Sequence, residues 1–521
     1  MNKVIDISTE PGALACACGG NPALFAGDGP QSHAALFKNT LSLLWGARRG
    51  LTRPELEQLL ETDDRAATAG WRLVANALDG ELSNRGGVWT FTHEHFRSAV
   101  QQRYLPDLDS QDLTRIKLAD YFAAQPISER SCDELPWLLW KTESFIRLRG
   151  CLLDIERFMQ APEASRNEWL QYWVEMREEQ NMGEYYLDSF ARWRRAHDAS
   201  PATVGACAKQ LGAFLLHAGL YAPAGRFYRL ALERFERVLG PDDINTLEVV
   251  NDLVLLLNKQ GGYTEAMSLG LRAWQGFERT LGPDHARTLN SVNNLAVVMY
   301  NQNDIATAMQ LYRRVLADFE RALGESHPDT LTCMANLAGL LCAQGEPDAA
   351  GVLYRKALAG FEQTLGPDHP RTLLSVSNLA RFLYDRGGDK AAESLFRRAL
   401  AGCERRLGPD HPDTLLNVSN LAGLLLHHGD LAGAGSLYHR ALYGFEQALG
   451  RNHPLTLTSV ANLAKFQEWQ GDLTAAALSY RRALAGYAAA FGASHPDTLN
   501  TQHDLDLLLA KQGDKATVKL R

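Results

Sequence analysis

The chain has 521 residues and a formal net charge of −8, from 53 basic and 61 acidic side chains. Hydrophobic residues make up 45% and charged residues 22%, as in an ordinary soluble protein. One hydrophobic core stops growing below this length, so we expect two or more cores or an array of repeated units. The acidic balance argues against a nucleic-acid partner, because such binding relies on a basic surface.

The amino terminus and the cysteines bear on location. The start lacks a basic region followed by an apolar run, and no later stretch reaches the roughly eighteen apolar residues of a membrane span. We therefore expect a cytoplasmic protein with no membrane partner. The eight cysteines include no CxxC motif, and Cys16 and Cys18 are one residue apart, which favours reduced thiols over disulfides or a metal site.

The first third of the chain predicts a leader and a small domain. Residues 1–35, rich in Gly, Ala and Pro, are expected to form a loose leader. Residues 36–105 show the order of a winged helix, with Gly86-Gly87 at the turn of its β-wing. The expected elements are helices at 36–46, 53–60 and 70–79, a hairpin at 81–92 and a helix from His93 onward.

This winged-helix-like module lacks the features of a DNA reader. Residues 36–105 carry nine Lys or Arg against eight Asp or Glu, and the expected helix at 70–79 is mostly apolar. A helix that reads a DNA groove would expose Arg, Asn and Lys. We therefore expect that helix to be buried packing.

Residues 106–200 predict irregular helices that link the module to the rest of the chain. They are rich in charged residues and in tryptophan: Trp137, Trp140, Trp169, Trp173 and Trp193. Residues 36–200 resemble the region that follows the NTPase in NACHT proteins with tetratricopeptide repeats (TPRs), of the nephrocystin type. The resemblance is carried by LSLLWGARRGLT, FTHEHFRSAVQQRYL, LADYF and DELPW (Asp133 to Trp137).

The sequence departs from that family at the nucleotide site. A phosphate-binding loop needs the pattern GxxxxGK[ST], and the dipeptide Gly-Lys does not occur in the chain, so the NTPase core is absent. In related signalling ATPases a winged-helix histidine touches bound ADP, and His93 is the matching candidate. The alternative is a structural role at the start of a helix. We expect no nucleotide cofactor.

The C-terminal part contains an internal repeat of 42 residues. A nine-residue motif close to LGPDHPDTL recurs seven times, with no insertion or deletion between copies. Such a period predicts a repeat array, in which each unit packs mainly on its neighbours. The copies begin at Leu239, Leu281, Leu323, Leu365, Leu407, Leu449 and Phe491.

Each repeat predicts two helices, called helix A and helix B. In the unit that starts at Leu407, an apolar stripe with helical spacing ends at Gly429-Asp430, and a second stripe ends at Leu449-Gly450. We expect the glycine to adopt the left-handed conformation that closes a helix. Pro412-Asp413 starts the next helix A, because proline is tolerated in a first turn and a carboxylate is favoured there.

These units resemble the TPR signature. The unit at 407–448 has Asn420-Leu421-Ala422 in helix A and then Ala434, Tyr438 and Ala441 in helix B. The 42-residue period resembles the kinesin-light-chain subclass. Ala422 and Ala441 are expected to let helices approach closely. The resemblance covers residues 200–521 and implies an all-α superhelical solenoid of about seven helix pairs, with a divergent first unit at 202–238 and a capping helix near 498–511.

The family resemblance places the ligand surface on helix A. The Asn before Leu-Ala resembles the position that bonds the backbone of a bound peptide, and an amide both donates and accepts. The alternative is that each Asn bonds the neighbouring repeat, and both roles are compatible. Flanking units carry Asp252 and Asp504 instead. The ladder comprises Asn294, Asn336, Asn378, Asn420 and Asn462.

Specificity is expected from the residue three positions after each Asn. Arg381 and Lys465 would attract acidic residues of a ligand, whereas Gly339 and Gly423 would leave room for large ones, and Val297 completes the row. The alternative for Arg381 and Lys465 is a solvated helix face. The basic pairs of helix B are expected to be surface residues: Arg313-Arg314, Arg355-Lys356, Arg397-Arg398 and Arg481-Arg482.

Six histidines recur in the motif but do not predict a metal site. Equivalent atoms of neighbouring repeats lie about 8–10 Å apart, whereas one zinc ion holds its ligands at about 2.0–2.1 Å. We expect these histidines to act at loops and helix starts. They are His285, His327, His369, His411, His453 and His495.

The sequence therefore predicts a non-catalytic scaffold that binds a peptide or protein in the concave TPR groove. No GxSxG, HExxH or dinucleotide motif indicates an enzyme. The alternative is a truncated or trans-acting sensor piece of a NACHT-type nucleotide switch. The expected domains are a leader (1–35), a winged-helix-like module (36–105), a helical linker (106–200) and a solenoid (201–521). The partner and the oligomeric state do not follow from the sequence.

Overall fold

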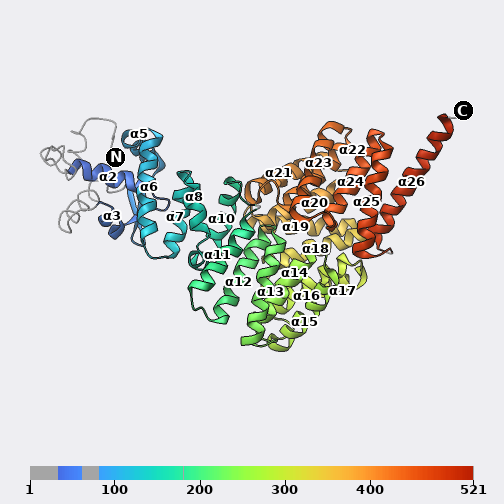
Figure 1. Ribbon diagram of the computed structural model, residues 1–521, viewed down its shortest axis with the longest axis horizontal. Helices are drawn as coiled ribbons and strands as arrows, with labels where there is room; N and C mark the ends of the chain where they lie inside the picture. Colours follow the sequence, from blue (N-terminus) through green and yellow to red (C-terminus); the bar gives the residue numbers. More distant parts are fainter. Residues whose placement is uncertain (1–32, 61–80, 180, 494, 520–521) are drawn as a thin grey trace. The chain divides into compact units, whose positions relative to one another are not determined.

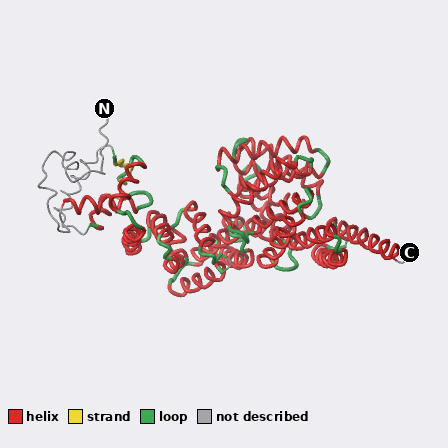
Figure 2. Tube along the Cα trace, turned by 90° about the horizontal axis from the view of Figure 1, so that it is seen from above, coloured by secondary structure: helices red, strands yellow, loops and turns green. Residues whose placement is uncertain are grey.

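The computed structural model describes residues 33–60, 81–179, 181–493 and 495–519. Helix dominates these residues, and strand occurs among them only in three short segments between residues 51 and 91 (Figure 2). The chain divides into two compact units, Met1–Tyr172 and Trp173–Arg521. Within the described ranges, no helix has the length and apolar character needed to cross a membrane.

The first unit contains a three-stranded antiparallel sheet in the order β1-β3-β2. The predicted hairpin is confirmed: Leu82 pairs with Phe91 and Arg85 with Val88. β1 adds a strand that the sequence analysis missed, because two residues carry no periodicity. The expected helix at 70–79 lies outside the described residues. The elements are α2 (His33–Gly46), β1 (Leu51–Thr52), α3 (Arg53–Leu59), β2 (Leu82–Arg85), β3 (Val88–Phe91), α5 (Glu94–Tyr104), α6 (Leu108–Ala124), α7 (Glu129–Lys141), α8 (Phe145–Leu152), α9 (Ile155–Gln160) and α10 (Glu163–Glu175), which runs across the division between the units.

The acidic residues of the DELPW segment hold the loop before β1. The carboxylate of Glu134, which is fully buried, accepts the backbone N–H groups of Arg48 and Arg49, both at 2.9 Å. Burial raises the pKa of Glu134, and the two N–H donors oppose that rise. This carboxylate is therefore committed to a loop of the first unit.

The second unit is an array of antiparallel helix pairs, as the repeat predicted. Seven pairs run from α12–α13 to α24–α25, and α26 ends the described array (Figure 1). The helices are α11 (Met182–Ala196), α12 (Pro201–His217), α13 (Tyr221–Val238), α14 (Ile244–Lys259), α15 (Tyr263–Leu281), α16 (Ala286–Asn301), α17 (Ile305–Leu323), α18 (Pro328–Ala343), α19 (Pro347–Leu365), α20 (Pro370–Asp385), α21 (Asp389–Leu407), α22 (Pro412–His427), α23 (Leu431–Leu449), α24 (Pro454–Gln470), α25 (Leu473–Phe491) and α26 (Pro496–Lys519).

The recurring nine-residue motif is a helix stop followed by a helix start. Gly450 ends α23 with φ 89° and ψ 164°, which is an extended positive-φ conformation and not the left-handed helical one that we expected. Only glycine adopts this region readily. His453 then caps α24, because its Nδ1 accepts the N–H of Leu455 at 3.2 Å. Thr456 closes the turn by donating to the carbonyl of Gly450 at 2.8 Å.

Close packing of helix A on helix B depends on small residues. Ala422 and Ala441 are both fully buried, as expected. A close approach also occurs at Gly444, which the sequence analysis did not single out. A Cβ there would lie 2.6 Å from Cδ2 of Leu415, so this leucine packs directly on the α23 backbone. The same contact recurs at Gly276, Gly360, Gly402 and Gly486.

Candidate partner-binding surface

The asparagine ladder divides into engaged and free members. The Asn294 amide donates to Asn251 of the preceding unit at 3.1 Å, and the Asn462 amide donates to Ser419 at 3.3 Å. Both bonds connect residues 43 positions apart, so these two amides join neighbouring repeats. Asn336 bonds the Tyr312 phenol, which opposes the rise that burial causes in the tyrosine pKa.

Asn378 and Asn420 differ from the other ladder members. Both side chains are half-buried, and neither makes a hydrogen bond to another residue in the described part of the chain. For Asn378 the cause is visible in the sequence, because the residue 43 positions earlier is Ala335, which has no polar side chain. The amides on α20 and α22 therefore keep their donors and acceptors available.

Arg381 is an exposed cation without an ion-pair partner among the described residues. Other cations of the A helices are paired: Arg371 with Asp329 at 3.1 Å, and Arg287 with Glu248 at 2.7 Å. The Arg381 charge acts on neighbouring side chains, since it opposes the burial that raises the pKa of Cys342 and Tyr354. Its free charge is thus located where α18, α19 and α20 come together.

Lys465 has a different environment. Its Nζ lies 3.5 Å from the Asp504 carboxylate on α26, and about half of its side chain is exposed. A second pair, Lys511 to Glu468 at 2.7 Å, also links α24 and α26. In α26 the ladder position is occupied by Asp504 and not by Asn, so Lys465 meets a carboxylate from the next unit. The equivalent residue after Arg381 is Asn420, which has no charge.

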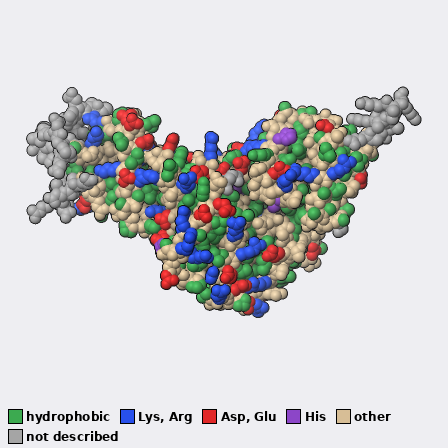
Figure 3. Space-filling view, in the orientation of Figure 1, with side chains coloured by type: hydrophobic (Ala, Val, Ile, Leu, Met, Phe, Trp, Pro, Cys, Tyr) green, Lys and Arg blue, Asp and Glu red, His purple; other side chains and the backbone are tan. Residues whose placement is uncertain are grey.

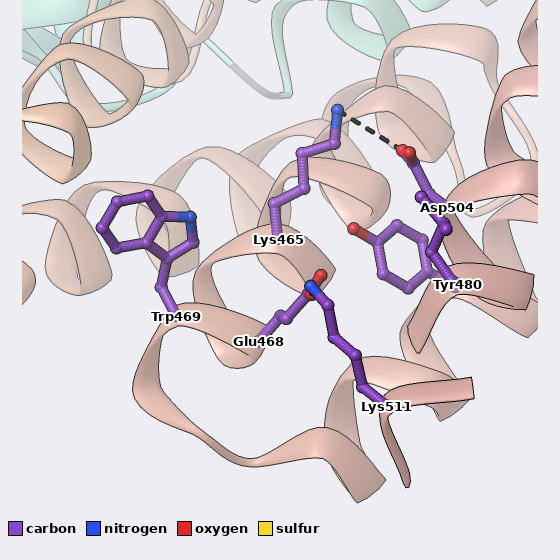
Figure 4. Close-up of a pocket in the computed structure, with 7 residues that line it drawn as sticks. Lys465, Glu468, Trp469, Tyr480, Asp504 and Lys511 are labelled. Atoms are coloured by element: carbon purple, nitrogen blue, oxygen red, sulfur yellow. Dashed lines mark hydrogen bonds and ion pairs between the residues drawn. The ribbon is translucent and has the colours of Figure 1, made fainter. Parts of the chain in front are cut away.

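A pocket of about 520 Å³ surrounds Lys465 (Figure 4). The close-up shows the indole of Trp469 on one side and the Lys465–Asp504 pair on the other. Trp469 is 63% exposed and was not foreseen as a surface residue of this site. Its sequence signal is its position four residues after Lys465, one helical turn further along the same face. The lining residues are Lys465, Glu468, Trp469, Tyr480, Asp504, Leu507 and Lys511.

The glycines of the specificity row offer less space than expected. A Cβ at Gly339 would lie 3.3 Å from the Tyr354 hydroxyl, and one at Gly423 would lie 3.4 Å from the Tyr438 hydroxyl. Burial raises the pKa of both phenols, so they stay neutral hydroxyls at physiological pH. Hydroxyl groups of helix B tyrosines thus lie beside the two glycines, which the sequence analysis missed.

The basic pairs of helix B differ in whether they bond their own repeat or the preceding one. Arg398 bonds Glu362 of the preceding helix B at 2.7 Å, and Lys356 bonds Glu325 at 2.8 Å. Arg397 pairs with Glu393 on its own helix at 2.6 Å. Basic and acidic side chains are interspersed over the visible face (Figure 3).

The motif histidines are helix caps, and the described residues contain no group of three or more side chains placed to hold a metal ion. In each case from His285 to His495 the Nδ1 atom accepts a backbone N–H two residues later. His93 starts α5 as an exposed residue that makes no side-chain capping bond.

Comparison with known proteins decides the family. The tetratricopeptide-repeat model matches residues 206–273, 249–321, 293–363, 330–405 and 414–489, which together exceed half of the chain. The chain belongs to the tetratricopeptide-repeat family. Repeat arrays of this family present extended concave surfaces to protein and peptide partners, so the repeats imply a protein–protein interaction scaffold.

The relatives include proteins of the nephrocystin type, which the sequence also resembles. The chain is 31% identical to human nephrocystin-3 over 229 residues and 29% identical to mouse nephrocystin-3 over 174 residues. These alignments cover 42% and 32% of the chain but only 17% and 13% of the two relatives. A crystal structure of repeats from a putative kinesin light chain of Podosopora anserina is 25% identical, with a TM-score of 0.32, and covers 39% of this chain and 95% of that one.

Proposed function

We propose that this TPR scaffold holds a peptide segment against the A helices α18, α20 and α22, and that Arg381 receives an acidic residue of that segment. The observation that carries the proposal is the set of unused polar groups in this part of the array. Asn378 and Asn420 have no hydrogen-bond partner, and Arg381 has no ion-pair partner, among the described residues.

The chemistry of these groups suits an extended chain. A peptide backbone presents donors and acceptors alternately, and a primary amide can satisfy both kinds at once. A guanidinium adds a charge-assisted bond to a carboxylate, which is stronger than a neutral one. Asn294 and Asn462 would contribute less, because their amides already bond the neighbouring repeat. Lys465 would have to exchange Asp504 for the ligand.

The test uses a displayed random-peptide library selected on the wild-type protein, followed by affinity measurements by fluorescence polarisation. We expect selected peptides to be enriched in Asp and Glu. Arg381→Glu should weaken their binding by about 1–3 kcal/mol, and the added change Lys465→Glu by less, because Lys465 is already paired. The control is Arg397→Glu with Arg398→Glu on helix B, which should leave the affinity unchanged. Binding that survives Arg381→Glu but is lost in the helix B variant would place the partner on the convex side.

A second candidate is a sensor piece of a nucleotide-dependent switch. The observation in its favour is the similarity to nephrocystin-3 together with the winged-helix-like elements of the first unit. These 521 residues contain no Gly-Lys dipeptide of a phosphate loop, so the nucleotide site of such a switch would lie outside them. In such a switch, residues 1–35 would be the leader, residues 36–105 the sensor module, residues 106–200 the linker and residues 201–521 the scaffold.

A further inference from the structure

Two loops of the array contact helix ends that lie far earlier in the chain. The loop before α22 meets the end of α12, where His411 Nε2 lies 3.0 Å from the carbonyl oxygen of His217. The loop before α24 meets the end of α14, where His453 Nε2 lies 2.6 Å from the carbonyl oxygen of Lys259. Both contacts span 194 residues, so two consecutive repeats form them in the same register.

Glycines at the two helix ends make room for these loops. Gly219 and Gly261 have φ values of 74° and 75°, and a Cβ would lie 2.6 Å from Pro412 or 2.7 Å from Pro454. Glycines at the same place in four later units, Gly345, Gly387, Gly429 and Gly471, would meet nothing within 4 Å. The first two glycines therefore act as notches that receive a proline.

Side chains next to the histidines strengthen the same junction. Lys259 Nζ lies 3.7 Å from the Asp413 carboxylate, and the ring of Tyr263 stacks on Phe491 with 5.6 Å between centroids. We call this set of contacts, between residues 217–263 and the helix ends at 411–413, 453–454 and 491, the seam.

The next repeat shows what the seam requires. His495 is the next motif histidine, and its buried Nε2 has no hydrogen-bond partner. The residue at the notch position of the corresponding unit is Asn303, with φ 66°, which carries the Cβ that Gly219 and Gly261 lack. In the described array, a motif histidine therefore bonds a distant carbonyl only where the facing helix end has glycine at the notch position, as at Gly219 and Gly261.

Both ring nitrogens of each seam histidine are engaged. Nδ1 of His411 accepts the N–H of Asp413 at 3.0 Å, and Nδ1 of His453 accepts the N–H of Leu455 at 3.2 Å. Each Nε2 must therefore carry the hydrogen that it donates to the distant carbonyl. A protonated imidazole would direct a second N–H toward a backbone N–H, which is repulsive.

We propose that His411 and His453 form a clasp that closes one turn of the repeat array, and that this clasp holds only while both imidazoles are neutral. It is a conformational device of the solenoid itself and does not depend on the peptide site proposed above.

The groups around the clasp have opposing effects, and together they lower the pKa of both histidines. Burial lowers the pKa of His411, with Lys259 and the His217 side chain acting in the same direction and Asp413 and the His217 carbonyl opposing them. Burial and Lys259 also lower the pKa of His453, while the bond to the Lys259 carbonyl opposes this. Tyr221 also lies near Lys259 and Asp413, and its raised pKa keeps it neutral. A lowered pKa means that the closed form resists protonation, so closure is complete above the ordinary histidine pKa and weakens as the pH falls below it.

The test couples adjacent amines and carboxylates in the full chain with a zero-length carbodiimide and measures the products by mass spectrometry. The Lys259–Asp413 product reports the seam, and the Lys465–Asp504 product is the internal reference, because that pair lies outside the seam at a similar distance of 3.5 Å. Protonation of the buried His411 and the half-buried His453 would place a desolvated charge in the closed form, so it should lower the ratio of the two products by about tenfold between about pH 7.5 and about pH 5.5.

Variants separate the clasp from helix capping. His411→Asn with His453→Asn keeps an N-cap acceptor but removes the Nε2 donor, so the product ratio should be low at both pH values. His285→Asn is the matched control, because His285 is an exposed motif cap outside the seam, and it should follow the wild type. The clasp would be overturned if the wild-type product ratio did not change with pH. It would also be overturned if the double variant kept the wild-type ratio, or if the His285→Asn control lost it.

Discussion

Leu415→Ala tests whether the array is stabilised by local packing between helix A and helix B. Leu415 is fully buried with Val418, Ala441 and Phe445. Truncating a buried leucine costs about 2–5 kcal/mol, depending on how far the cavity collapses. Here the methyl groups contact Gly444, which has no side chain that could move into the space. We therefore expect a cost of about 4 kcal/mol, in the upper part of that range.

The chain provides a matched control at the equivalent position of its last unit. Leu499 is 55% exposed, because no helix B follows α26 in the described chain. Leu499→Ala should change stability by no more than about 0.5 kcal/mol. The assay is urea denaturation followed by circular dichroism, with the free energy of unfolding compared between the two variants. A cost below about 1 kcal/mol for Leu415→Ala, or equal costs at the two positions, would refute local packing as the source of stability.

Two further predictions concern charge and nucleotides. Burial raises the pKa of Asp252 to about 7, so its contribution to stability is complete below its ordinary pKa and is lost as the pH rises through about 7. Asp252→Asn should therefore stabilise the protein by about 1–2 kcal/mol at pH 8 and have little effect at pH 4, as measured by denaturation at both pH values, and a loss of stability at pH 8 would contradict it. A calorimetric titration with ATP and Mg²⁺ should show no binding, because the sequence has no phosphate loop, whereas micromolar binding would support the nucleotide switch and make His93 the first residue to test.

Helix boundaries could be predicted from the sequence because local residues set them. Gly450 ends one helix and Pro454 begins the next, and the structure has α23 ending at Leu449 and α24 beginning at Pro454. The two-residue strand β1 could not be predicted, since its pairing with β3 is its only signal. The backbone of Gly450 also differed from the expected left-handed form, because the motif continues as an extended loop.

The candidate site was only partly predictable. The sequence correctly located the ladder on the A helices, but its members share one motif and still differ in their contacts. Asn294 bonds the preceding repeat because the residue 43 positions earlier is Asn251. Asn378 makes no such bond because the residue 43 positions earlier is Ala335, which has no polar side chain. Arg381 and Lys465 occupy equivalent positions, yet only Lys465 meets a carboxylate. The exposed Trp469 and the tyrosine hydroxyls beside Gly339 and Gly423 appear only when helices are packed.

The sequence by itself determined the repeat period, the helix pairs and the family, because caps, turns and apolar stripes act within one or two turns of a helix. Only the tertiary structure decided that His411 and His453 meet carbonyl groups 194 residues away. That separation is not a property of any single repeat. It results from the small rotation between each repeat and the next, which accumulates along the array until one turn reaches another.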